Sequence, residues 1–82
     1  MLRLTDLRLP LGHADNALRP ALLARLGLPD NQLLAFHVFK RAHDARKKAA
    51  IQLIYTVDLE VEDEAEVLAR WNGDPHVRPA PD

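Results

Sequence analysis

The chain has 82 residues, of which 48% are hydrophobic and 28% charged, and its formal net charge is −1. This length allows one domain with a single small core, and the absence of cysteine excludes a disulfide framework, a thiolate metal site and a cysteine nucleophile. The near-neutral charge gives no general attraction to nucleic acid or anionic membranes. No apolar stretch has the length of a signal peptide core or a membrane span, and we expect a cytoplasmic protein without membrane contacts.

The first predicted element is a strand over residues 1–9. The leucines at positions 2 and 4 alternate with polar residues, whereas those at positions 7 and 9 fall on the opposite parity. A β-bulge near residues 5–6 would return all four leucines to one face of the strand. Pro10 ends the strand.

A helix is predicted from about Asn16 to Leu26, because leucine and alanine recur there at three- and four-residue spacing. Asp15 or Asn16 is expected to cap its first free N–H groups. Pro20 is tolerated only near the start of a helix, and Gly27 provides the left-handed residue that commonly ends one.

Residues 33–61 are predicted to form two long strands joined by a basic tip. The second strand alternates strictly from position 51 to position 61, which predicts one apolar face that includes Tyr55. The first strand alternates less regularly. Its charged residues are typical of an edge strand, where they discourage pairing with another chain.

The tip, residues 40–48 (KRAHDARKK), contains five of the eleven basic residues of the chain and one acid. Such a cluster is either solvated, paired with the chain's own acids, or a contact site for an anion such as phosphate or an acidic patch on a partner. The candidate contact residues are Lys40, Arg41, Arg46, Lys47 and Lys48. No catalytic residue or metal ligand is predicted, because the chain has no serine and its four histidines are scattered.

Six of the twelve acids lie between positions 58 and 66, at the start of a second predicted helix. Asp63 is expected to cap this helix and Glu66 to complete a capping box, so the acidic run is interpreted as structural. Val67, Leu68 and Trp71 form the expected buried stripe. Because these acids lie at the far end of the hairpin from the basic tip, we expect the two charge clusters to stay apart.

The order β-α-β-β-α, followed by a short possible strand in residues 76–82, predicts an α+β two-layer sandwich. The ferredoxin-like β-α-β-β-α-β topology is the best candidate. It places the first and third strands in the centre of the sheet and the second and fourth at its edges. The last strand is expected to be short or missing.

The hairpin also carries a resemblance to a known family. Residues 36–61, with the opening LRLTDLRLPLGH and the helix end LARLGLPD, resemble the N-terminal region of a family of bacterial FAD-dependent dehydrogenases. In that family a basic hairpin of the form K/R-R-S-x-D-A-R-K-K precedes a strand ending in Y-T-V/L-D. The chain matches this pattern at seven positions and has Ala42 where the family commonly has serine. The matching residues are Lys40, Arg41, Asp44, Ala45, Arg46, Lys47 and Lys48.

The resemblance implies that residues 1–82 are the N-terminal domain of a longer flavoprotein whose FAD-binding Rossmann-type domain follows. The three glycines are far apart and form no G-x-G-x-x-G motif, so we expect no cofactor in this domain and no catalysis by it alone. It would be an accessory domain whose partners are the catalytic domains of its own parent chain.

Two alternatives come from the residues themselves. A small nucleic-acid-binding module would use the basic tip on phosphates, but the predicted sheet lacks the exposed aromatic pair on which bases stack. A protein-interaction module would instead use an exposed strand edge.

Overall fold

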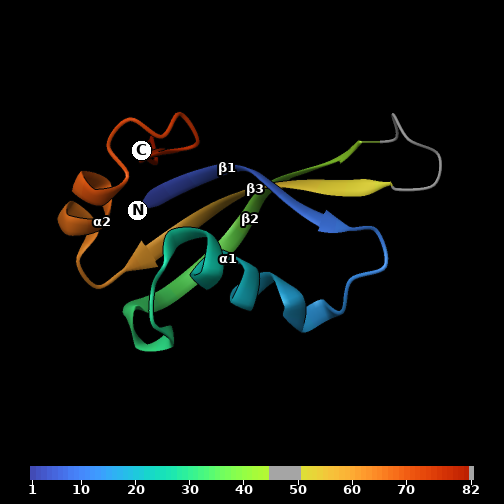
Figure 1. Cartoon of the computed structure of the whole chain (residues 1–82), viewed down its shortest axis with the longest axis horizontal. Helices are drawn as coiled ribbons and strands as arrows, with labels where there is room; N and C mark the ends of the chain where they lie inside the picture. Colours follow the sequence, from blue (N-terminus) through green and yellow to red (C-terminus); the bar gives the residue numbers. More distant parts are fainter. Residues whose placement is uncertain (45–50, 82) are drawn as a thin grey trace.

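The computed structural model describes residues 1–44 and 51–81, which form a four-stranded antiparallel sheet and two α-helices (Figure 1). The strand order β2-β3-β1-β4 and the two-layer α+β arrangement are those predicted for a ferredoxin-like domain. The elements are β1 (Leu2–Pro10), a 3-10 turn η1 (Asp15–Ala17), α1 (Leu18–Leu26), a 3-10 turn η2 (Asp30–Gln32), β2 (Leu33–Asp44), β3 (Gln52–Val61), α2 (Glu64–Arg70) and β4 (Val77–Pro79).

One apolar cluster joins the helices to the inner face of the sheet. Leu22 of α1 is completely buried, as are Val57 and Leu59 of the central strand β3. Val67 of α2 belongs to the same cluster. Tyr55, predicted to be buried, is 5% exposed. The strict alternation of β3 therefore supplies the apolar surface on which both helices pack.

Strand β1 contains the predicted bulge. Its register against β3 shifts between Leu4 and Leu7, and Asp6 adopts a left-handed backbone conformation with φ of 59°. The extra residue returns Leu7 to the buried face that Leu2 and Leu4 occupy.

Strand β2 has two further bulges that the sequence analysis did not predict. The register against β3 shifts between Leu33 and Ala35 and again between Val38 and Lys40, so that Leu34 and Phe39 are the additional residues. Both of these side chains are exposed. Each bulge interrupts the regular backbone pattern of β2, which is an edge strand as predicted.

The expected cap of the first helix was wrong. Asp15 and Asn16 lie inside the 3-10 turn η1, and the residue before α1 is Ala17, whose own backbone is helical and which provides no side-chain cap. The chain thus enters the helix through a tighter turn. Gly27 ends α1 in the predicted left-handed conformation, with φ of 65°.

The second helix is capped as predicted, since the Asp63 carboxylate accepts a hydrogen bond from the Glu66 backbone N–H. Of its expected stripe, Val67 is buried, whereas Leu68 and Trp71 are partly buried. The indole N–H of Trp71 donates to the Leu26 carbonyl at 3.1 Å and so joins α2 to the end of α1.

The last strand is present but short. Strand β4 pairs with the first residues of β1, from Leu2 to Leu4, and does not pair with the rest of β1. The Ala80 backbone N–H donates to the Met1 carbonyl at 2.8 Å. Both chain ends therefore lie at one end of the molecule, opposite the end of β2 and the start of β3 (Figure 1).

Replacing Leu22 with alanine tests the core. We expect a loss of about 2–5 kcal/mol of unfolding free energy, measured by chemical denaturation, because a completely buried leucine leaves a cavity. The matched control is Leu34→Ala, whose leucine is 55% exposed and whose loss should change stability by less than about 0.5 kcal/mol. Equal effects of the two substitutions would contradict the packing of α1 on the sheet.

The pair Asp6→Ala and Asp6→Gly tests the left-handed bulge. Both variants lack the carboxylate, but only alanine carries a Cβ into the positive-φ conformation. We expect the glycine variant to be more stable by about 1 kcal/mol in denaturation experiments. An alanine variant at least as stable as the glycine variant would show that residue 6 is not left-handed in solution.

Candidate functional site

The structure places two of the five predicted contact residues. Lys40 and Arg41, which begin the predicted basic tip, still lie in the edge strand β2, and they pair in register with Thr56 and Tyr55. The strand continues to Asp44 because each residue from Lys40 onward pairs with a residue of β3. The other three predicted residues, Arg46, Lys47 and Lys48, lie outside the described part of the chain.

Lys40 and Arg41 belong to opposite faces of the sheet. Arg41 pairs with the buried Tyr55 and lies on the face that α1 covers, whereas Lys40 pairs with Thr56 on the open outer face. The bulge at Phe39 decides this assignment, because one additional residue reverses the alternation that follows it. The two cations therefore cannot approach one small ligand from the same side of the strand.

A groove lies between the start of α1 and the inner face of the hairpin, and its volume is about 560 Å³. We call it the helix-side groove. Its apolar lining comes from Leu11, Leu18, Val38 and Leu53, and its polar lining from His13, Asp15, Arg41 and Tyr55. Sequence analysis predicted Arg41 as a contact residue but missed the groove, since its lining comes from three separate stretches of the chain.

The hydrogen bonds of His13 define its tautomer in the groove. Nδ1 is 2.7 Å from the Ala14 carbonyl oxygen, which can only accept, so Nδ1 carries a proton. Nε2 is 2.7 Å from the Tyr55 hydroxyl. In the neutral ring, Nε2 accepts, and the Tyr55 hydroxyl is the donor. The phenol proton is thereby directed to His13, and the phenol oxygen remains available as an acceptor.

The outer face of the sheet carries a buried ion pair. The Arg3 guanidinium donates to both oxygens of Asp58, at 2.8 and 3.0 Å, across neighbouring strands. Phe39 covers the pair from β2, with the Arg3 guanidinium carbon 3.9 Å from the centre of its ring. Asp58, 6% exposed, is the one charged residue that is buried within residues 1–44 and 51–81.

The charged form of Asp58 is stabilised by its surroundings. Hydrogen bonds from Arg3 lower the pKa of the Asp58 carboxyl against the opposing effect of burial, and the nearby His37, at 3.5 Å, acts in the same direction as Arg3. The same pairing raises the pKa of Arg3. Sequence analysis assigned Asp58 to the acidic run and did not find its partner, which lies 55 positions away in the chain.

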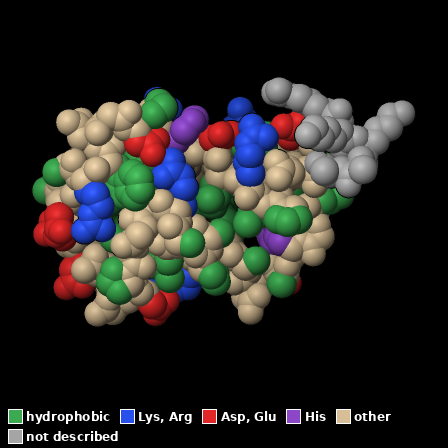
Figure 2. All heavy atoms as spheres, viewed as in Figure 1, with side chains coloured by type: hydrophobic (Ala, Val, Ile, Leu, Met, Phe, Trp, Pro, Cys, Tyr) green, Lys and Arg blue, Asp and Glu red, His purple; other side chains and the backbone are tan. Residues whose placement is uncertain are grey.

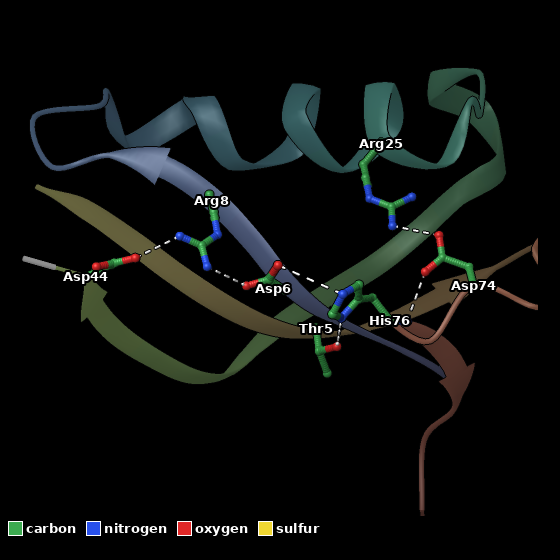
Figure 3. Close-up of polar contacts among 7 residues, drawn as sticks. All are labelled: Thr5, Asp6, Arg8, Arg25, Asp44, Asp74 and His76. Carbon is green, nitrogen blue, oxygen red and sulfur yellow. Dashed lines mark hydrogen bonds and ion pairs between the residues drawn. The ribbon is translucent and has the colours of Figure 1, made fainter. Parts of the chain in front are cut away.

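A second group of polar contacts surrounds the β1 bulge (Figure 3). Thr5 Oγ1 is hydrogen-bonded to His76 Nδ1 at 3.0 Å, and the Asp6 carboxylate lies between Arg8, at 3.2 Å, and His76 Nε2, at 3.9 Å. The last distance is beyond hydrogen-bond range, so Asp6 does not orient the imidazole as the acid of a catalytic triad would. The contacts fix the loop before β4 against the bulge.

The contacts in Figure 3 continue on both sides of the bulge. Arg8 also donates to Asp44 at 2.8 Å, which joins β1 to the edge strand β2 across β3. On the other side, Arg25 and the backbone N–H of His76 donate to Asp74 and lower the pKa of its carboxyl. These ion pairs hold separate elements together and leave none of the participating carboxylates without a cation.

Several acids of positions 58–66 have partners within the described residues. Besides Asp58 and the helix cap Asp63, Glu64 contacts the N-terminal ammonium at 2.8 Å, and Glu66 contacts Arg70. Within the described residues, none of these acids pairs with Lys40 or Arg41. Figure 2 shows basic, acidic and hydrophobic side chains interspersed over one face of the molecule.

No three histidine, aspartate or glutamate side chains in residues 1–44 and 51–81 gather as metal ligands would. No helix in that part of the chain is long and apolar enough to cross a membrane.

Comparison with protein families gives one match, over residues 1–60, to the family described as Domain of unknown function (DUF8436). The chain belongs to this family. The match includes β1, α1, β2 and nearly all of β3, and therefore the helix-side groove and the Arg3–Asp58 pair. No curated protein matches the chain.

The depressed pKa of Asp58 predicts a pH-dependent stability. A carboxyl with a lower pKa in the folded state stabilises the fold above its unfolded pKa of about 3.9. That contribution is lost as the pH falls through the folded pKa. We expect Asp58→Asn to be less stable than the wild type at pH 7, with the difference shrinking below about pH 4 in denaturation experiments.

Glu60→Gln is the matched control for this prediction. Glu60 lies two residues away on the same face of β3, is exposed and makes no ion pair in the described residues. Its substitution should change stability little at any pH. A stability gap for Asp58→Asn that stays constant down to pH 2 would contradict the role of the Asp58 charge.

Proposed function

We propose that this domain is a non-catalytic accessory domain of an FAD-dependent oxidoreductase and that it docks on the catalytic domains of its parent chain through the hairpin β2–β3. The observation that carries the docking role is the exposed apolar surface of the edge strand β2. Leu34 and Phe39 are 55% and 59% exposed on this one strand. Apolar side chains gathered in this way are typical of contact surfaces.

Two bulges determine how such a surface would be used. Leu34 and Phe39 are the additional residues at these bulges, where the regular ladder of the strand is interrupted. An interrupted edge is a poor template for an added strand, so docking would occur through side chains rather than through a continued sheet. The strand-pairing form of the protein-interaction hypothesis is therefore the weaker one.

The charge next to these side chains indicates the chemistry of the partner surface. Lys40 is exposed on the outer face directly after Phe39, and no ion pair of Lys40 exists within the described residues. A partner surface that combines apolar and acidic residues would complement it. Arg46, Lys47 and Lys48 would add to this contact or bind an anionic ligand.

The oxidoreductase assignment rests on the sequence pattern of the hairpin. The pattern K/R-R-S-x-D-A-R-K-K followed by Y-T-V/L-D supports a parent chain that binds FAD in a later domain and works in the cytoplasm. The gene beyond codon 82 gives the direct check. Continuation into a strand, a G-x-G-x-x-G turn and a helix supports the assignment. A stop codon at that point would overturn it.

Docking is tested by adding residues 1–82 to a parent protein that lacks them and measuring binding by calorimetry. We expect the truncated parent to keep its flavin absorbance and to bind the added domain. Leu34→Asp and Lys40→Glu should each weaken binding by about tenfold or more, because they place an acid on the apolar and basic contact surface.

Leu11→Asp and Arg78→Glu are the matched controls for docking. Both change an exposed residue to an acid away from the outer edge of β2, and we expect wild-type affinity. Loss of flavin on truncation would instead place the domain in the cofactor site. Equal weakening by all four substitutions would contradict a docking surface on β2.

A further inference from the structure

We propose that the helix-side groove is a binding site for a small amphiphilic carboxylate, with the carboxylate on Arg41 and the apolar part of the ligand against Leu11 and Val38. This inference concerns the inner face of the hairpin. It does not rest on the docking role proposed for the outer edge.

The groove has the size and composition of a ligand site. Its volume of about 560 Å³ lies within the range of about 300–1,000 Å³ found for small-molecule pockets. The lining comes from the loop after β1, the start of α1 and both strands of the hairpin. Such sites combine an apolar lining with a few polar groups that orient the ligand.

The apolar lining is incompletely covered. Leu18 and Leu53 are buried at 8% and 6% exposure, whereas Leu11 and Val38, which line the same groove, are 49% and 42% exposed. A hydrocarbon chain over Leu11 and Val38 would remove apolar surface from water, which is favourable in proportion to the area buried. This feature selects a ligand with an apolar part.

Arg41 supplies the anion-binding group. Its guanidinium is exposed, lines the groove and makes no ion pair with the residues that the structure describes. A guanidinium offers paired N–H donors that match the two oxygens of a carboxylate. Arg41 is therefore the group in the groove that would bind a carboxylate directly.

The remaining charge of the lining sets a limit on the ligand. Asp15 also lines the groove and also makes no ion pair within the described residues, so with a neutral His13 the formal charge of the lining is zero. A phosphate or a nucleic-acid backbone carries more negative charge and would be repelled by Asp15 without a second cation to compensate. A monoanion with one carboxylate is the better match.

The Tyr55–His13 hydrogen bond fixes the orientation of the ligand. Because the Tyr55 hydroxyl donates to His13, its oxygen has no proton left for a carboxylate. The carboxylate would therefore be directed to Arg41, at the β2 side of the groove.

The test uses residues 1–82 labelled with ¹⁵N and titrated with sodium octanoate below its micellar concentration. We expect saturable amide shifts in residues 11–18, 38–41 and 53–55, with a Kd in the low millimolar range or below, which about ten heavy atoms can provide. Acetate, octanol and inorganic phosphate are the comparison ligands. Each lacks the apolar part or the carboxylate and should bind at least about tenfold more weakly.

Two neighbouring substitutions separate the groove from general charge attraction. Arg41→Met should weaken octanoate binding by about tenfold, whereas Lys40→Met removes the same charge from the opposite face and should leave binding unchanged. Amide spectra of both variants report whether the fold is retained. Equal octanoate affinity in Arg41→Met and the wild type would overturn the proposal. So would octanol binding as tight as octanoate, or no saturable shift in the groove.

Discussion

The core side chains of three long strands must all lie on the one face of the sheet that the helices cover. Strand β3 meets this requirement by strict alternation, whereas β1 and β2 meet it only by inserting residues. Because side chains in a strand alternate with a period of two, one inserted residue reverses every position that follows it. The bulges at Asp6 and Leu34 are therefore the condition on which the common core depends, whereas the bulge at Phe39 follows the last core residue of β2, Phe36.

The same insertions determine the chemistry of the surface. In β1, the bulge brings Asp6 between Arg8 and His76. In β2, the bulge at Phe39 places an aromatic ring over Arg3 and assigns Lys40 to the outer face and Arg41 to the inner face. One run of basic residues in the sequence thus becomes two separate positive positions, one on the open face and one in the helix-side groove.

Local signals in the sequence were sufficient for much of the fold. The change of parity in the first leucines predicted the β1 bulge, Gly27 predicted the end of α1, and Asp63 predicted the cap of α2. The start of α1 was not predictable in this way, because a 3-10 turn occupies the positions where a capping side chain was expected. The β2 bulges were not predictable from the sequence, because an edge strand that is exposed on both faces shows no clear apolar alternation.

Local sequence signals could not predict the contacts between residues far apart in the chain. The Arg3–Asp58 pair and the His13–Tyr55 hydrogen bond join residues 55 and 42 positions apart, and they follow only from the exact pairing of β1 with β3. The lining of the helix-side groove likewise depends on which residues of β2 face α1. A single unpredicted bulge was enough to place Arg41 on that side.

The contact between Met1 and Ala80 has a consequence for how the domain connects to other protein. Because the two ends leave the sheet as neighbours, any covalent attachment, at either end, is made at the same pole of the molecule. Forces transmitted through the backbone would act first on β1 and β4, at the pole opposite the end of β2 and the start of β3.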